Sequence, residues 1–199
     1  MPGRENEFQA SMNEGIDYAR ALGCPNLHVM AGLVDATEDM SAHRRTYVRN
    51  LRIAAAMAQA HGITLLIEPI NHRDMPGYFL NRLEQALEVV REVDAPNLKI
   101  QLDFYHVQIT EGDLATKLRR YLPEVGHIQI AGVPGRHEPD IGEINYPYLF
   151  SLLGELGYTE WIGCEYRPLG DTAEGLGWMK AEGMKAHLSS SGYAAPAER

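Results

Sequence analysis

Four apolar stretches of this chain end in a polar side chain, and this repeated pattern constrains the fold more than any other feature. The stretches are Thr64-Leu-Leu-Ile-Glu68, Lys99-Ile-Gln-Leu-Asp103, His127-Ile-Gln129 and Trp161-Ile-Gly-Cys-Glu165. They follow one another at about the length of one strand–helix–strand unit, which is roughly 30 residues. A carboxylate that ends an apolar strand is costly to bury. Because the carboxyl ends of parallel strands open onto one face of a barrel, we expect these four side chains to converge there.

Helical and extended patterns alternate along the whole chain. A fifth strand, over 27–30, precedes the four above and carries no metal-ligating or proton-transferring residue at its end. The other strands are expected over 63–68, 98–103, 126–130 and 161–165. Helices are expected over 5–22, from a cap at Ser41 to a stop at Gly62, from Asn81 onward, up to Leu122, over 147–156 and over 172–187.

Apolar strands that alternate with helices predict an α/β fold with a parallel sheet, of the (β/α) TIM-barrel type. A complete barrel takes about 250 residues, and this chain has 199. We therefore expect about five of eight strands, with the barrel incomplete at the N-terminus. No break in composition separates the chain into parts. We expect one barrel domain over residues 1–188 and a disordered tail over 189–199.

Composition excludes several classes of partner. The formal net charge is −9, which disfavours nucleic acid and anionic membranes. No apolar run reaches the ~18 residues of a membrane span. The two cysteines, Cys24 and Cys164, make no disulfide framework, so a cytoplasmic location is expected.

The four polar strand ends suit a metal site. Three carboxylates on one barrel mouth repel one another unless a cation neutralises them or one carboxyl holds a proton. The oxygen donors of Glu68, Asp103, Gln129 and Glu165 suit Mg²⁺ or Mn²⁺ better than zinc. Structural alternatives are a strand-to-strand ion pair of Glu68, a helix cap by Asp103, a hydrogen bond of Gln129, and an ion pair of Glu165 with Arg167.

Two further residues are candidates for binding a substrate. His106 comes three residues after Asp103, so on a helical turn it would point back over the same mouth and donate to a substrate hydroxyl or oxyanion. Its alternative is a surface histidine that caps its own turn. Arg136 lies in the polar loop 135–145 and could bind a substrate carboxylate, or the loop could simply be solvated.

Five motifs together resemble the hydroxypyruvate isomerase family and the wider group of xylose isomerase-like barrels, which includes ketose 3-epimerases and endonuclease IV. The likeness runs from residue 2 to about residue 187. The motifs are Leu66-Ile-Glu-Pro-Ile-Asn71, Gln101-Leu-Asp-Phe-Tyr-His106, Gly126-His-Ile-Gln-Ile-Ala131, Pro139-Asp-Ile-Gly-Glu-Ile-Asn-Tyr146 and Gly163-Cys-Glu-Tyr-Arg-Pro168.

The resemblance assigns roles to particular residues. It implies that Glu68 and Glu165 are the acid/base pair, and that Glu68, Asp103, Gln129 and Glu165 are the metal-binding positions. Sugar epimerases usually have histidine where this chain has Gln129, and this difference favours the hydroxypyruvate isomerase branch. Endonuclease IV uses many more histidines to hold three zinc ions, and this chain lacks them.

The resemblance also implies an activity. It is that of an isomerase which interconverts hydroxypyruvate and 2-hydroxy-3-oxopropanoate (tartronate semialdehyde) by proton transfer through an enediolate, with a divalent cation, Mg²⁺ or Mn²⁺, and no organic cofactor. The expected partner is a small anionic hydroxy-oxo acid, with no nucleic acid and no membrane; homo-oligomer formation is left open. The alternatives are an isomerase or epimerase of a longer sugar acid or ketose, such as 2-oxo-tetronate isomerase, and an inactive barrel fragment.

Overall fold

The computed structural model describes residues 2–35 and 37–180 of the chain. The described residues divide into two compact units. The first unit comprises residues up to Ile130 together with Glu160–Cys164, and the second comprises Ala131–Thr159 together with the residues from Glu165 onward. Each unit is described by itself below.

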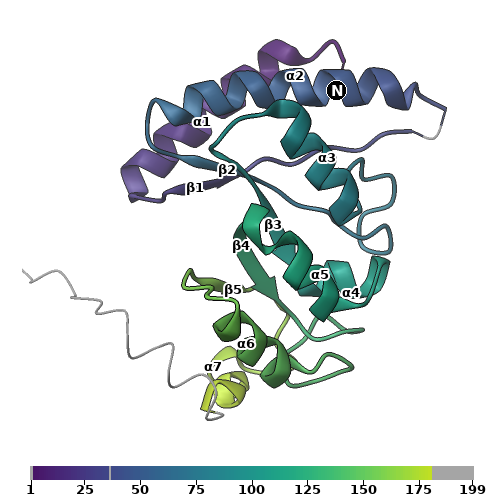
Figure 1. Cartoon of the computed structure of the whole chain (residues 1–199), viewed down its shortest axis with the longest axis vertical. Helices are drawn as coiled ribbons and strands as arrows, with labels where there is room; N and C mark the ends of the chain where they lie inside the picture. The colour runs from purple at the N-terminus through teal and green to yellow at the C-terminus, as the bar shows by residue number, and fades with distance from the viewer. Residues whose placement is uncertain (1, 36, 181–199) are drawn as a thin grey trace, which may run out of the picture. The chain divides into compact units, whose positions relative to one another are not determined.

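The first unit is built on a parallel sheet of five strands, in which every strand pairs with its neighbour along the chain (Figure 1). The predicted α/β fold and the predicted count of five strands are confirmed within the described residues. In the pairing register Asp103 lies opposite Gln129, and Gln129 lies opposite Gly163. The strands are β1 (Asn26–His28), β2 (Thr64–Ile67), β3 (Leu98–Asp103), β4 (Val125–Ile130) and β5 (Ile162–Cys164).

Helices connect these strands and pack against the sheet. α2 contacts β2, α3 contacts β3, and α4 contacts β4, while α1 and α2 lie side by side (Figure 1). The helices of the first unit are α1 (Glu5–Leu22), α2 (Met40–Gln59), α3 (Leu83–Val93), α4 (Phe104–Thr110), α5 (Leu114–Tyr121) and the 3₁₀ turn η1 (Leu122–Glu124).

Strands β3 and β4 alternate between apolar and polar positions, and their apolar side chains join those of β2 in the core. Leu65, Ile67, Ile100 and Leu102 are fully buried. Side chains on a strand point to opposite faces in turn, so the positions between these residues share the other face. That face carries the polar residues of β3 and β4, which are Lys99, Gln101, Asp103, His127 and Gln129. Burying a leucine or isoleucine stabilises the fold by about 1.5–3 kcal/mol each, which offsets the cost of this polar face.

Several predicted boundaries are corrected by the structure. Helix α1 and strand β3 have the predicted limits, and α1 ends at Gly23 with a φ of 63°. Helix α2 begins earlier than predicted, because its cap is Asp39 and not Ser41: the Asp39 carboxylate accepts from the Ser41 N–H at 2.8 Å. The helical segment predicted up to Leu122 is two helices, separated by Gly112, whose φ of 62° favours glycine.

The second unit holds the predicted loop and the last helices. Helix α6 (Tyr146–Glu155) begins after Asn145, whose side chain accepts from the Tyr148 N–H. The predicted helix 172–187 is instead a four-residue helix, α7 (Thr172–Gly175), followed by the 3₁₀ segment η2 (Leu176–Lys180). The remainder of that prediction, and the predicted tail over 189–199, lie outside the described residues.

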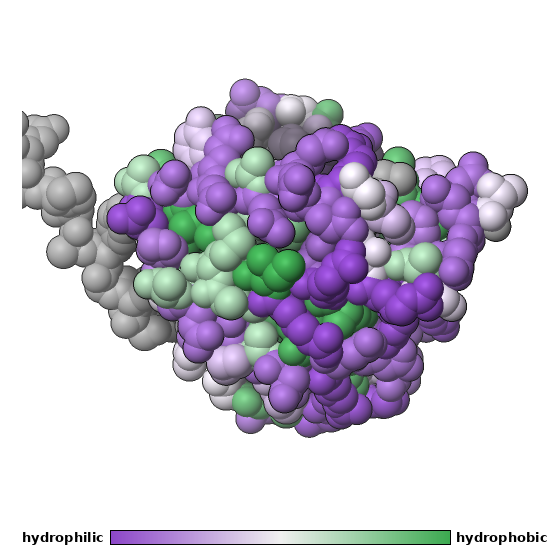
Figure 2. All heavy atoms as spheres, turned by 90° about the horizontal axis from the view of Figure 1, so that it is seen from above, coloured by the Kyte–Doolittle hydropathy of each residue, from purple (hydrophilic) through white to green (hydrophobic). Residues whose placement is uncertain are grey.

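Figure 2 shows a face on which hydrophilic residues predominate and hydrophobic ones form small patches. Among the helices of the described ranges, none is both long and apolar enough to cross a lipid bilayer.

Candidate active site

Glu68 and Asp103 lie close together at the carboxyl edge of the sheet. Asp103 ends β3 and Glu68 directly follows β2, which pairs with β3 in parallel. Both residues are almost completely buried, with exposed fractions of 3% for Glu68 and 1% for Asp103. Parallel pairing explains this proximity, because it places the ends of neighbouring strands at one edge.

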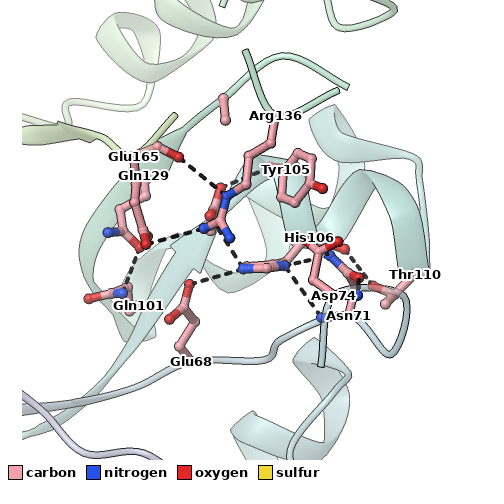
Figure 3. Close-up of polar contacts among 12 residues, drawn as sticks. Glu68, Asn71, Asp74, Gln101, Tyr105, His106, Thr110, Gln129, Arg136 and Glu165 are labelled. Carbon is pink, nitrogen blue, oxygen red and sulfur yellow. Dashed lines mark hydrogen bonds and ion pairs between the residues drawn. The ribbon is translucent and has the colours of Figure 1, made fainter. Parts of the chain in front are cut away.

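His106 joins these carboxylates from the first turns of α4. Its Nε2 lies 3.8 Å from Glu68 Oε1 (Figure 3). The same atom lies 3.7 Å from Asp103 Oδ2. One ligand atom from each of the three residues can be chosen so that all lie within 4.8 Å of one another. His106 is only 2% exposed, so the alternative of a surface histidine is wrong.

Asp103 uses its two oxygens differently. Oδ1 accepts from the Tyr105 N–H at 2.9 Å and so caps α4, while Oδ2 faces His106. Asp103 therefore caps the helix, as the structural alternative expected, and also belongs to the buried cluster with Glu68 and His106. The cap fixes the carboxylate, because Oδ1 cannot turn away without leaving a buried N–H unsatisfied.

Gln129 takes part in a pair that the sequence analysis missed. Its Oε1 accepts from Gln101 Nε2 at 2.6 Å (Figure 3). The period-two alternation of β3, which puts Gln101 on the same face as Asp103, is the signal that could have revealed this partner. Gln129 is therefore hydrogen-bonded, as the structural alternative expected, and the role of Gln129 at a metal site stays a prediction.

His28 was also missed, since the first strand was expected to carry no such residue. His28 ends β1, and its Nε2 lies 3.5 Å from Glu68 Oε2. Burial lowers the pKa of His28, so its imidazole is neutral at neutral pH. The strand was predicted to end at Met30 but ends two residues earlier, at His28, which is why the polar residue at its end was overlooked.

Tyr78 is a further neighbour of Glu68. Burial, and to a smaller extent the charge of Glu68, raises the pKa of Tyr78 to about 12. Its hydroxyl oxygen accepts from the Ala31 N–H at 2.8 Å. Tyr78 therefore remains a neutral phenol beside a carboxylate over the whole physiological range.

Arg136 and Glu165 pair with each other in the second unit. Arg136 Nη2 lies 3.2 Å from Glu165 Oε1, and Arg136 Nε donates to the Glu165 carbonyl oxygen at 3.4 Å (Figure 3). The Glu165 side chain is 54% exposed, and that of Arg136 is 18% exposed. The alternative ion pair of Glu165 was expected with Arg167, but in the structure its partner is Arg136.

The donor chemistry of the buried cluster fits a hard divalent cation. Two carboxylates held this close repel each other unless a cation or a proton lies between them. Carboxylate oxygens are the ligands that Mg²⁺ and Mn²⁺ prefer. A site of this kind, at the carboxyl ends of parallel strands, is typical of TIM-barrel enzymes.

Comparison with known proteins identifies the family. The profile of the family described as "Xylose isomerase-like TIM barrel" matches residues 2–182. The chain therefore belongs to the xylose isomerase-like TIM barrel family, which confirms the resemblance seen in its motifs, and its curated relatives are named isomerases.

Two curated relatives carry different isomerase names. The chain is 56% identical over 180 residues to 2-oxo-tetronate isomerase of Cupriavidus necator, covering 90% of this chain and 69% of that protein. It is 45% identical over 179 residues to hydroxypyruvate isomerase of Escherichia coli, again covering 90% of this chain and 69% of the relative.

A solved structure has the same fold. The crystal structure described as AP endonuclease, family 2, from Brucella melitensis superposes with a TM-score of 0.88 at 47% sequence identity. The match covers 90% of this chain and 69% of that one. The likeness therefore extends over most of this chain and about two thirds of its relatives.

Proposed function

We propose that this chain is a sugar-acid isomerase that interconverts a 2-oxo-3-hydroxy acid and the corresponding 2-hydroxy-3-oxo acid, with hydroxypyruvate as the substrate. The observation that carries the proposal is the buried cluster of Glu68, Asp103 and His106 at the carboxyl edge of the sheet. The isomerase names of the relatives support the class of reaction.

The reaction requires one proton transfer between neighbouring carbons. A carboxylate removes a proton from C3 of hydroxypyruvate, the C–H electron pair forms the C2=C3 double bond, and the C2 carbonyl oxygen takes the negative charge. A proton is then returned to C2, O2 gains a proton, and O3 loses its proton as the C3 aldehyde forms. The product is 2-hydroxy-3-oxopropanoate, and atoms and charge balance without an oxidant or reductant.

Glu68 is proposed as one of the two acid/base groups, with Glu165 as the other. Glu68 is suited to this role because it is buried and lies beside the neutral His28 and Tyr78, which do not neutralise it. A positioned acid or base typically contributes about 10²–10⁴-fold to the rate. The assignment of Glu165 rests on the resemblance of the Gly163–Pro168 motif.

His106 and Arg136 are proposed to bind the substrate. A neutral imidazole can donate to the oxygen that becomes negative in the enediolate. The Arg136 guanidinium, now paired with Glu165, offers the planar fork that matches the carboxylate of the substrate.

A divalent cation held by Glu68, Asp103, Gln129 and Glu165 would, when bound, stabilise negative charge on the substrate oxygens. Mg²⁺ and Mn²⁺ are the proposed ions, because every donor in this set is an oxygen.

A four-carbon substrate is the second candidate. The relative with 56% identity is named 2-oxo-tetronate isomerase, and a 2-oxo-tetronate carries the same 2-oxo-3-hydroxy acid group as hydroxypyruvate. The proton transfer would be identical, so only the space around C4 distinguishes the two. Endonuclease action on nucleic acid is disfavoured by the net charge of −9.

A direct assay tests the proposal. The chain should interconvert hydroxypyruvate and tartronate semialdehyde in the presence of Mg²⁺ or Mn²⁺, and comparison with 2-oxo-tetronate at equal concentration ranks the two substrates by kcat/KM. Turnover of neither acid by folded protein would support the inactive-fragment alternative. A cytoplasmic location and a single domain over 1–188 stay predictions, and homo-oligomer formation stays open.

A further inference from the structure

We propose that Asn71 is a positioning residue that fixes the tautomer of His106, so that His106 presents an Nε2–H, and not a lone pair, to Glu68 and Asp103. The use of this donor on a substrate oxygen rests on the proposed function, but the tautomer itself does not. All four residues belong to the first unit.

The orientation of the Asn71 amide is set by its own loop. The Asp74 backbone N–H, which can only donate, lies 2.8 Å from Asn71 Oδ1. The oxygen of the amide is thereby identified, and the opposite atom is the NH₂ group. This group, Nδ2, lies 2.7 Å from Nδ1 of His106 (Figure 3).

Nδ1 of His106 is therefore an acceptor. The Asn71 Nδ2 can only donate, and the backbone N–H of Asn71 points at the same ring nitrogen at 3.4 Å. A proton on Nδ1 would face two N–H groups. Asn71 is 0% exposed and His106 is 2% exposed, so no bulk water can replace the lost bonds.

The other ring nitrogen must then carry the proton. A neutral imidazole has one N–H, so an accepting Nδ1 means a protonated Nε2. Nε2 is the atom that lies 3.8 Å from Glu68 and 3.7 Å from Asp103. His106 thus faces the carboxylates as a hydrogen-bond donor.

The position of this proton decides whether His106 is a metal ligand or a hydrogen-bond donor, because the distances alone allow both roles. Glu68, Asp103 and His106 lie close enough together to form a metal triad. A histidine that binds a metal presents a lone pair and donates from its other ring nitrogen to a carboxylate or carbonyl. Here the other nitrogen receives a hydrogen bond, which is the reverse arrangement. His106 is therefore a donor beside the cation site and not one of its ligands.

The test is the tautomer of His106 in the ¹⁵N-labelled full chain, read from long-range ¹H–¹⁵N correlations of the imidazole. His106→Gln identifies the signals by their loss. The expected spectrum has an unprotonated Nδ1 and a protonated Nε2, and this pattern should persist when Mg²⁺ is added. A protonated Nδ1 in the wild-type chain, or metal coordination at Nε2, would overturn the proposal.

Asn71→Asp provides the second measurement, because the isosteric carboxylate accepts where the amide donates. We expect the proton to move to Nδ1 and kcat to fall about 10²-fold, the typical loss of one oxyanion donor, with KM little changed. Asn97→Asp is the matched control, because the Asn97 amide donates to the carbonyl oxygens of Ala55 and Ile63, away from His106. The control should leave the His106 spectrum unchanged.

The outcomes separate the two proposals. An unchanged tautomer in Asn71→Asp contradicts the inference, and if that variant does not fold, the wild-type spectrum alone decides it. The expected spectrum in a chain without isomerase activity would contradict the proposed function and leave the tautomer inference standing.

Discussion

At the scale of single residues, the site depends on side chains that do two things at once. Asp103 caps α4 with one oxygen and faces His106 with the other. Asn71 holds its own loop through Asp74 and contacts His106 through its amide group. Such residues are fixed in position by backbone hydrogen bonds, which is what a preorganised site requires.

The two functions of Asp103 can be separated by substitution. In Asp103→Asn the amide oxygen still accepts from the Tyr105 N–H, so stability should change little while the affinity for Mg²⁺ or Mn²⁺ falls. In Asp103→Ala both functions are lost, and we expect a further loss of about 1–3 kcal/mol of stability from the unsatisfied N–H. Urea denaturation and calorimetry with the metal measure the two effects; equal stability of the two variants would contradict the capping role.

Two buried tyrosines provide a matched pair. The Tyr78 hydroxyl accepts from the Ala31 N–H, whereas that of Tyr47 has no hydrogen-bond partner among the described residues. Tyr78→Phe should cost about 1 kcal/mol, and Tyr47→Phe should be neutral or stabilising. Thermal denaturation of both variants checks this, and a larger cost for Tyr47→Phe would show that the hydroxyl bonds to something else, such as buried water.

At the scale of elements, most of the sheet and helices followed from periodicity. The limits of α1 and β3 were predicted from an apolar stripe and from an apolar run that ends in Asp103. The errors in the predicted boundaries lie where two nearby residues could both fill the same role. Asp39 and Ser41 are both good caps, and only the actual backbone turn selects Asp39.

The candidate site, too, could be predicted only in part from the sequence. Glu68, Asp103 and His106 could be predicted because they stand at fixed places after apolar strands. The period of β3 puts Gln101 on the face of Asp103, but its pairing with Gln129 became visible only with the register of the sheet. The contacts of His28 and Asn71 likewise needed the register and the path of the loop after β2. Pairings between distant segments leave no signal in local periodicity.

The cap of α2 is directly testable. Asp39→Ala should destabilise the chain by about 1 kcal/mol, because the Ser41 N–H loses its acceptor. Ser41→Ala, the residue predicted as the cap, is the control and should have little effect. A greater cost for Ser41→Ala than for Asp39→Ala would restore the original prediction.

At the scale of the whole molecule, two half-buried histidines link stability to pH. Burial lowers the pKa of His28 in β1 and of His127 in β4. The unfolded chain therefore takes up these protons at a higher pH than the folded chain does. The stabilising contribution is fully present above the unfolded pKa of about 6.5 and is lost as the pH falls toward the lowered folded values.

Denaturation midpoints should therefore decrease as the pH is lowered below about 6.5. His127→Gln should flatten this dependence, and His61→Gln, at an exposed turn after α2, is the control. An unchanged pH dependence in His127→Gln would contradict burial as the cause.

The measurement that tests the central claim most directly is proton exchange at the substrate carbon. Hydroxypyruvate is incubated in D₂O with the wild-type chain or with Glu68→Gln, and the deuterium that enters at C3 is followed by NMR. If Glu68 removes the proton, the wild-type chain should introduce deuterium at C3 and form tartronate semialdehyde. In the folded Glu68→Gln variant, the rates of deuterium entry and of product formation should both be lower by about 10²–10⁴-fold. Exchange at the wild-type rate in Glu68→Gln would contradict the account.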